Sequence, residues 1–298
     1  MPILRLAAIT DEFSPDLDVA LDAMAAAGVA GVELRTLGGR NIVDLTDREV
    51  DRACVAVATR DMTIVSIASP LLKCVLPEAP TLDPLVQRDT FGSSYTFADQ
   101  PRLTDRVFAI ARKTAAPVIR VFSYWRTIDP EACGPQIVAA LTSLADRARD
   151  EGVTIGLENE HACNVGTGDE SGRLLASLDH SALGLIWDPA NALVLGETPY
   201  PDGYRHVPIV RMVHVHAKDC RVIDHVPVWG PLGEMDVDWG GQLSALQRDG
   251  YSGWVSLETH WSGPRGDKLE ASVVCARMLQ RLVSANDPGA QPGAEDVC

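Results

Sequence analysis

Apolar runs and amphipathic segments alternate along most of the chain. Strands are expected where a short apolar run ends in a polar residue or a turn, at residues 2–10, 30–35, 63–69, 117–123, 153–158, 183–188, 210–216 and 253–258. Helices are expected between them, at residues 16–27, 45–60, 102–115, 131–151, 170–178, 239–249 and 267–283. Strands that alternate with helices form parallel sheets, and eight such units in 298 residues predict a single (β/α)₈ barrel over residues 1–283.

Local signals support this division of the chain. Thr46 followed by Glu49 is typical of a capping box at the start of a helix. The connection at residues 70–100 is long enough to be either functional or disordered. Residues 284–298 are rich in Pro, Gly, Ala and Asp, and we expect a flexible tail with no role in a site. No G-x-G-x-x-G segment follows the first strand, which counts against a dinucleotide-binding sheet.

Composition narrows the classes of function. The chain is 46% hydrophobic and 22% charged, as in globular proteins, and its net charge of −15 counts against binding nucleic acids or anionic membranes. Seven cysteines are scattered without CxxC pairs, which favours reduced thiols in the cytoplasm. The first residues lack the basic start of a secretory signal, and no apolar run approaches the length of a membrane helix.

Four consecutive strands end in residues that can bind a metal ion. These residues are Glu158, Asp188, His216 and Glu258. In a (β/α)₈ barrel, the carboxyl ends of the strands meet at one mouth, where function is located. Because side chains alternate along a strand, we expect Met212, His214 and His216 to share one face.

Three carboxylates and one imidazole at one mouth are costly to bury as unpaired charges. A divalent cation would compensate them, and this mixture favours Mn²⁺, Mg²⁺ or Co²⁺ over a structural zinc site. The alternative is that each acid has its own arginine or lysine partner, which is the ordinary explanation for any single one of them.

The motifs around these residues resemble the xylose isomerase-like barrel superfamily, and in particular its sugar phosphate isomerase/epimerase group. The similarity covers residues 1–283. It is carried by Leu-Glu158-Asn, Asp188-Pro-Ala-Asn191, His214-Val-His216-Ala-Lys218-Asp219, Leu-Glu258-Thr-His, Gly31-Val-Glu33-Leu-Arg35 and Ile119-Arg-Val-Phe-Ser123.

The resemblance implies that Glu158, Asp188, His216 and Glu258 bind one divalent metal ion, with Mn²⁺ expected first and Mg²⁺, Co²⁺ or Zn²⁺ as alternatives. It implies that Glu158 and Glu258 also form the catalytic acid/base pair. His216 is preferred to His214 because it fits the His-x-Lys-Asp pattern of the group. His214 is then either a residue that supports the ligands or a hydrogen-bonded core histidine. Dimers and tetramers are common in the group, so a homo-oligomer is compatible with the resemblance.

This chemistry has three outcomes. A metal ion that holds a ketone oxygen lowers the cost of the enediolate formed when a carboxylate removes the neighbouring proton. Return of the proton gives an isomer or an epimer of a carbohydrate, which is the predicted activity. Loss of a β-hydroxyl gives a lyase, which is the alternative, such as a keto-inositol or dehydroshikimate dehydratase or an enzyme that eliminates an aglycone from a 3-keto-glycoside.

Several polar residues near the strand ends are candidate substrate contacts, and each has a structural alternative such as an ion pair. The candidates are Arg120, His161, Asn191, Lys73, Lys218 and His260. Glu12 and Glu33 end the first two strands and are further polar candidates. Trp125, Trp229 and Trp261 could form either a wall for a sugar or the cores of loops. The loop after the seventh strand departs from the group, because Gly233-Glu-Met-Asp236 stands where Gly-Glu-Gly is common.

Two other classes of function are disfavoured. A DNA-repair nuclease of the same superfamily uses three metal ions and many more histidines, whereas this strongly acidic chain has seven histidines. A sugar-binding barrel without activity would not need both glutamates.

Overall fold

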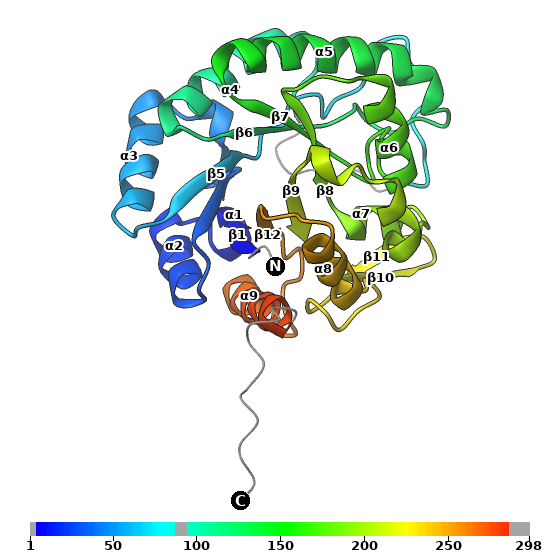
Figure 1. Cartoon of the computed structure of the whole chain (residues 1–298). Coiled ribbons are helices and arrows are strands. Elements are labelled where there is room, and N and C mark those ends of the chain that lie inside the picture. Colours follow the sequence, from blue (N-terminus) through cyan, green and yellow to red (C-terminus); the bar gives the residue numbers. More distant parts are fainter. Residues whose placement is uncertain (1–3, 87–93, 286–298) are drawn as a thin grey trace, which may run out of the picture.

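A closed parallel barrel forms the centre of the molecule (Figure 1). The computed structural model describes residues 4–86 and 94–285. Neighbouring strands follow the order β1-β12-β9-β8-β7-β6-β5-β2, and β2 pairs with β1, which confirms the predicted (β/α)₈ architecture. The strands are β1 (Arg5–Ile9), β2 (Gly31–Leu34), β5 (Thr63–Ile67), β6 (Val118–Val121), β7 (Thr154–Glu158), β8 (Leu183–Trp187), β9 (Met212–Ala217) and β12 (Trp254–Leu257).

The longer helices surround the barrel as an outer ring in Figure 1. In chain order the helices are α1 (Thr10–Phe13), α2 (Leu17–Ala26), α3 (Asp47–Ala58), α4 (Gln100–Thr114), α5 (Gly134–Glu151), α6 (Gly168–Ser177), α7 (Pro189–Val194), α8 (Trp239–Arg248) and α9 (Lys268–Ala285), and the short α1 and α7 closely follow β1 and β8. The capping box predicted for α3 is confirmed, because the Thr46 side chain accepts from the Glu49 N–H and Glu49 caps Thr46 in return. Asp16 caps α2 in a similar way, and its carboxylate accepts from the N–H groups of Asp18 and Val19.

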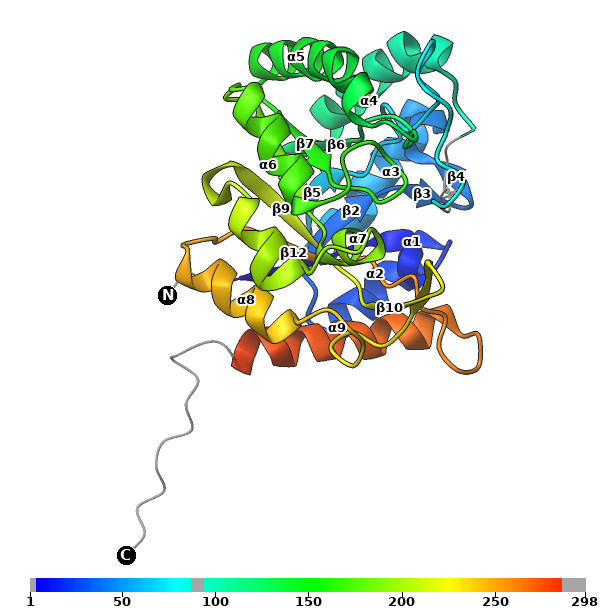
Figure 2. The ribbon, with the colours of Figure 1, turned by 90° about the vertical axis from the view of Figure 1, so that its right-hand side faces the viewer.

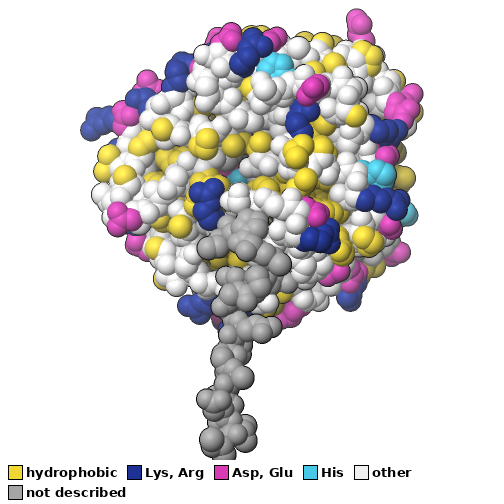
Figure 3. Space-filling view, viewed as in Figure 1, with side chains coloured by type: hydrophobic (Ala, Val, Ile, Leu, Met, Phe, Trp, Pro, Cys, Tyr) yellow, Lys and Arg dark blue, Asp and Glu magenta, His cyan; other side chains and the backbone are white. Residues whose placement is uncertain are grey.

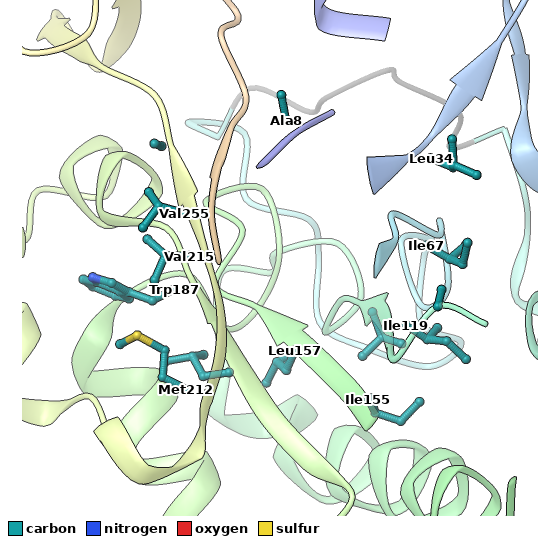
Figure 4. Packing of buried hydrophobic residues seen from close by; sticks show 14 of the residues in the cluster. Ala8, Leu34, Ile67, Ile119, Ile155, Leu157, Trp187, Met212, Val215 and Val255 are labelled. Carbon is teal, nitrogen blue, oxygen red and sulfur yellow. The ribbon is translucent and has the colours of Figure 1, made fainter. Parts of the chain in front are cut away.

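Small residues on the inner face let the strands close tightly. A Cβ atom on Gly156 would lie 2.7 Å from the Cγ1 of Ile186, and one on Gly31 would lie 2.6 Å from the Cβ of Ala7. The outer faces carry large apolar residues that pack against the helices (Figure 4). Burying each such side chain contributes about 1.5–3 kcal/mol, so this layer supplies most of the packing energy of the barrel.

The prediction that Met212 shares a face with His214 and His216 is wrong. Met212 pairs with Leu185, whereas His214 pairs with Ile186, so β9 has one extra residue at this point. Such a bulge reverses the alternation. Met212 therefore lies in the outer core beside Trp187 (Figure 4), while the two histidines keep the inner face.

Two hairpins extend the carboxyl ends of the strands and were not predicted. They are β3–β4 (Thr36–Leu37 and Arg40–Asn41), which follows β2, and β10–β11 (Cys220–Ile223 and Val226–Trp229), which follows β9. Both lie on the same side of the barrel, at the right in Figure 2. The site is therefore framed by added structure on two sides.

The ends and loops agree with the predicted boundaries only in part. The closing helix continues to Ala285, two residues into the predicted tail, and residues 286–298 lie outside the described residues. In the long connection, residues 70–86 and 94–100 are described, and residues 87–93 are not.

Helix hydropathy, cysteine state and surface charge are three further properties of the described part of the chain. Within residues 4–86 and 94–285, no helix is long and apolar enough to cross a membrane. The six cysteines described there are free thiols. On the face seen in Figure 3, acidic and basic side chains are intermixed, and hydrophobic side chains lie across the middle.

Candidate metal centre and active site

The four predicted ligands converge at the mouth of the barrel. Glu158 ends β7, His216 lies in β9, and Asp188 and Glu258 directly follow β8 and β12. One ligand atom from each lies within 4.8 Å of the others, and all four residues are buried. Because β7, β8, β9 and β12 are consecutive neighbours in the sheet, their ends form one arc with a glutamate at each end.

His216 lies between the two glutamates. Its Nδ1 atom is 3.1 Å from Oε1 of Glu158 and 3.7 Å from Oε2 of Glu258. The Asp188 carboxylate is held by the start of α7, because its Oδ1 accepts a hydrogen bond of 3.0 Å from the N–H of Asn191.

Glu33 on β2 contacts both histidines of β9. Its Oε1 lies 3.0 Å from Nε2 of His214 and 3.2 Å from Nε2 of His216. A carboxylate on the far nitrogen of a histidine fixes the ring orientation and the tautomer that binds a metal ion. His214 shares the Glu33 carboxylate with His216 and lies outside the cluster of Glu158, Asp188, His216 and Glu258.

Arginine and lysine side chains reach the same carboxylates. Arg35 donates to Oε1 of Glu258 at 2.9 Å, and its guanidinium also contacts Asp11 and Glu12. Lys218 Nζ lies 2.7 Å from Oε2 of Glu258 and 3.0 Å from Oδ2 of Asp188. Both oxygens of Glu258 are therefore held by cations.

Glu158 has a different set of neighbours. An Nη1 of Arg120 lies 3.1 Å from its Oε2, and Asn191 donates to its Oε1 at 3.4 Å. Arg120 Nη1 is also 3.9 Å from Oε1 of Glu258, so this arginine lies between the two glutamates.

These surroundings shift the pKa values of the three carboxylates in different directions. Burial raises the pKa of Glu158, but His216 and Arg120 outweigh it and lower the pKa below its usual value. For Glu258, burial is outweighed by Lys218 and the neighbouring histidines, so the pKa lies well below the usual range. For Asp188, burial dominates over Lys218, and its pKa is raised.

The unsatisfied oxygens fit a divalent cation. Oε2 of Glu158 and Oδ2 of Asp188 are buried and accept no hydrogen bond among the described residues, although cationic nitrogens lie nearby. In the described chain, seven buried carboxylates face four buried lysines and arginines: Glu12, Glu33, Glu158, Glu160, Asp188, Asp219 and Glu258 against Arg35, Lys73, Arg120 and Lys218.

A metal ion binds histidine in its neutral form. With the histidines neutral, these buried carboxylates outnumber the buried lysines and arginines, and a divalent ion would supply the missing positive charge. The alternative of separate arginine or lysine partners accounts for Glu258 but leaves Asp188 with only a shared lysine. The donor set of three carboxylates and one imidazole thus fits Mn²⁺, Mg²⁺, Co²⁺ or Zn²⁺.

The predicted substrate contacts lie around this cluster. His161 Nδ1 is 2.9 Å from both Oδ1 of Asn191 and Oε1 of Glu160. Glu160 also faces Lys73 at 3.5 Å. Lys73 from the long connection therefore reaches the mouth, as do Arg120 and Lys218 described above.

His260 closes the other flank of the site. Its Nε2 is 3.4 Å from Oε1 of Glu258, and its backbone N–H donates to Glu12 at 3.0 Å. The φ angle of His260, 51°, lies in the left-handed region, which residues other than glycine rarely adopt. Residues with such a backbone cluster at functional sites. The fold thus brings together all six predicted contacts.

Three residues of the site were missed as functional candidates: Arg35, Glu160 and Asp219. Arg35 lies two residues after Glu33, so strand alternation alone would have aimed it at the mouth. Glu160 follows Glu158 in the same way. Asp219 gave no such signal, because its partners lie up to 18 residues later in a loop.

Curated relatives match part of the chain. An inosose dehydratase of Lacticaseibacillus casei is 24% identical over 164 residues, which are 50% of this chain and 54% of that protein. The chain thus spans about half the length of the curated relatives it matches.

Solved structures match nearly all of it. An IOLI protein with a bound zinc atom has a TM-score of 0.72 and 18% identity, over 96% of this chain and all of the other. An L-ribulose 3-epimerase has a TM-score of 0.68 and 16% identity, over 99% of this chain and all of the other. At these identities the likeness concerns the fold. The family model of xylose isomerase-like TIM barrels matches residues 21–279, and the chain therefore belongs to that family.

Proposed function

We propose that this protein is a divalent-metal-dependent enzyme that transfers a proton at the carbon next to a carbonyl group of a sugar or polyol derivative. The observation that carries this proposal is the placement of Glu158 and Glu258 at the two ends of the ligand arc. Both approach the Nδ1 atom of His216, at 3.1 and 3.7 Å. Two carboxylates that face one small volume can serve as a base and an acid for the same carbon.

A divalent ion held by the four ligands would polarise a substrate carbonyl and make the neighbouring C–H group more acidic. The protein supplies the rest of the chemistry. One glutamate takes the proton, and the other returns a proton at its destination. Arg35 and Lys218 fix the direction of the Glu258 carboxylate, and Arg120 does the same for Glu158. Fixed donors of this kind cost no reorganisation during the reaction.

Substrate hydroxyl groups would meet the polar side chains at the rim. His161 and Asn191 form one hydrogen-bonded pair there, and Lys73 lies beside Glu160. His260 approaches from the opposite flank. Side chains whose own orientation is fixed by such contacts position a substrate most accurately.

Isomerisation or epimerisation is the first candidate reaction. Return of the proton from the opposite face inverts the carbon, and return to the adjacent carbon moves the carbonyl group. Inversion needs a second carboxylate across the site, which the pair Glu158 and Glu258 provides, whereas one carboxylate can move the proton between adjacent carbons.

Dehydration is the second candidate, favoured by Lys218. This ammonium lies 2.7 Å from Glu258, where a hydrogen-bond donor can assist the departure of a β-hydroxyl group as water. The partial similarity to an inosose dehydratase supports the same candidate.

Proton NMR in D₂O distinguishes these reactions. The protein is stripped with a chelator, reloaded with Mn²⁺, and incubated with open-chain and cyclic ketones of sugars and polyols. Deuterium at the α-carbon with every hydroxyl retained means isomerase or epimerase, and an unsaturated product means lyase. Absence of exchange with every ketone would overturn the proposal.

Metal binding is tested independently by calorimetry. Titration of the stripped protein with Mn²⁺, Mg²⁺, Co²⁺ and Zn²⁺ should give one site per chain. Asp188→Asn should abolish it, whereas Asp249→Asn, on a surface turn, should leave it unchanged.

A further inference from the structure

Trp229 lies beside two side chains that contact Glu258, one of the two proposed acid/base residues. It is the last residue of β11, and its indole ring contacts the ring of His260 with centroids 4.8 Å apart and the two planes inclined by 52°. The Lys218 ammonium is 5.5 Å from the centre of the same indole. His260 and Lys218 both contact the carboxylate of Glu258, so Trp229 flanks the two groups that adjoin this glutamate.

The hairpin that carries Trp229 is closed at its base by Asp219. The carboxylate of Asp219 accepts hydrogen bonds from four backbone N–H groups, at 2.8–3.3 Å; these belong to Cys220, Gly233, Met235 and Val237. The backbone oxygen of Asp219 accepts a fifth, from Gly230. Both ends of the segment 220–237 are thus tied to the residue that follows Lys218.

The other partner of Trp229 is fixed as well. His260 has a left-handed backbone, with φ at 51°, and its N–H is bound by Glu12. Strained backbone persists where the surrounding structure enforces it, often at ligand-binding sites. The tilted Trp229–His260 pair therefore forms a fixed aromatic contact beside Glu258.

The aromatic residues elsewhere at the mouth differ in exposure. Phe122 and Trp125 are 0% and 6% exposed, and the Lys73 ammonium lies 4.4 Å and 5.7 Å from the centres of their rings. Trp229 keeps part of its surface exposed. An indole face is flat, apolar and electron-rich, and attracts C–H groups that carry partial positive charge. A polyhydroxylated ring presents such a face of C–H groups, whereas an open chain presents no fixed flat face.

We infer that Trp229 is a specificity-determining residue that selects ring-shaped polyol ketones over open-chain ketoses by stacking the substrate ring on its indole. The inference rests on the proposed function, because it assumes that the reacting carbon faces Glu258. It adds to that function the shape of the substrate.

The test compares matched substrates and variants in the metal-loaded protein. The cyclic ketone is 2-keto-myo-inositol, and the open-chain ketone is L-erythrulose, which cannot close into a five- or six-membered ring. Trp229→Ala should lower kcat/KM for the cyclic ketone about tenfold, mainly through KM, and change that for erythrulose less than about twofold. Trp229→Phe should restore most of the loss. Should Trp229→Ala not fold, Trp229→Leu removes the flat face while keeping an apolar side chain.

Trp261→Ala is the matched control, since Trp261 is also partly exposed on the adjoining loop. It should leave the ratio between the two ketones unchanged. An equal loss for both ketones in Trp229→Ala, or the same ring-selective loss in Trp261→Ala, would overturn the inference.

Calorimetry with unreactive polyols separates this inference from the proposed function. Myo-inositol should bind the wild type more tightly than erythritol does, and Trp229→Ala should remove the difference. If that preference is seen while no ketone exchanges deuterium, the inference holds and the proposed reaction fails. If neither polyol is preferred, the inference fails even where ketones are turned over.

Discussion

The two halves of the barrel contribute different kinds of residue to one site. Strands β7, β8, β9 and β12, the ligand half, end in Glu158, Asp188, His216 and Glu258. Strands β1, β2, β5 and β6, the supporting half, bring Glu33, Arg35 and Arg120, which contact those ligands, and Glu12 and Lys73, which contact their neighbours. Under the proposed function, the reacting groups come from the ligand half, while the orientation of each depends on the supporting half.

Charge explains this division. Carboxylates crowded at one mouth repel each other, and each needs a cation or a hydrogen-bond donor to remain ionised. Arg120 on β6 reaches Glu158 on the neighbouring β7, and Arg35 at the end of β2 reaches past β1 to Glu258 for this reason. Glu33 performs the corresponding task for the two histidines of β9. The four predictions below test whether the halves can be separated in this way.

Removing the acid/base group of the ligand half should have the largest effect. Glu258→Gln should lower kcat about 10³-fold, because an amide cannot take the proton. Deuterium exchange into the substrate measures it. Glu78→Gln makes the same change at an exposed position and should be neutral. Unchanged exchange in Glu258→Gln would remove this glutamate from the mechanism.

Removing the main cation of the supporting half should affect stability first. Arg35→Met leaves Asp11, Glu12 and Glu258 without their shared guanidinium, and should lower the free energy of unfolding by about 3–5 kcal/mol. Urea unfolding at neutral pH measures this change.

Arg40 provides the matched control, because its ion pair with Glu49 is half exposed. Arg40→Met should cost less than about 1 kcal/mol. If both variants lost equally little, Arg35 would have no special part in holding the mouth.

The contact between Glu33 of the supporting half and His216 of the ligand half should also set metal affinity. Glu33→Gln should weaken metal binding about 10–100-fold, because His216 loses the carboxylate that orients its ring. Calorimetric titration with Mn²⁺ measures the affinity, with Glu78→Gln as the control. Full affinity in Glu33→Gln would mean that packing alone orients His216.

The smallest effect concerns pH and the hairpin after β9. Burial raises the pKa of Asp219 from 3.8 to about 6, although its four backbone donors oppose part of this shift. Between these two values the folded state binds more protons than the unfolded state, so this group's contribution to the unfolding free energy falls as pH rises through that window. Local opening of the hairpin has the same sign, because it returns Asp219 to water and to its ordinary pKa, so protonation favours the closed hairpin.

Amide hydrogen exchange can detect this dependence. After correction for the chemical rate, exchange at Gly233, Met235 and Val237 should be roughly several-fold slower at about pH 5 than at neutral pH. Asp219→Asn has no group that titrates there and should lose this dependence on pH. A rate independent of pH in the wild type would show that the closed hairpin does not raise the pKa of Asp219.

Much of the site was accessible from the sequence because its signals are local. A strand that ends in a ligand is visible within a few residues, as in Leu-Glu158-Asn and Leu-Glu258-Thr-His. The capping box at Thr46 is visible for the same reason. The face of Met212 was assigned wrongly because a bulge depends on the neighbouring strand and leaves no mark in the alternation of β9 itself.

The sequence by itself determined the eight βα units and the closed barrel, and it indicated four candidate ligands at the strand ends, because periodicity and strand ends are short-range properties. Only the tertiary structure decided which side chains share a carboxylate. Arg35 meets Glu258 across 223 residues of chain, and Glu33 meets His214 across 181. It also decided that Asp219 closes the hairpin of Trp229 beside the site. Such contacts follow from barrel closure and loop packing, which no local pattern encodes.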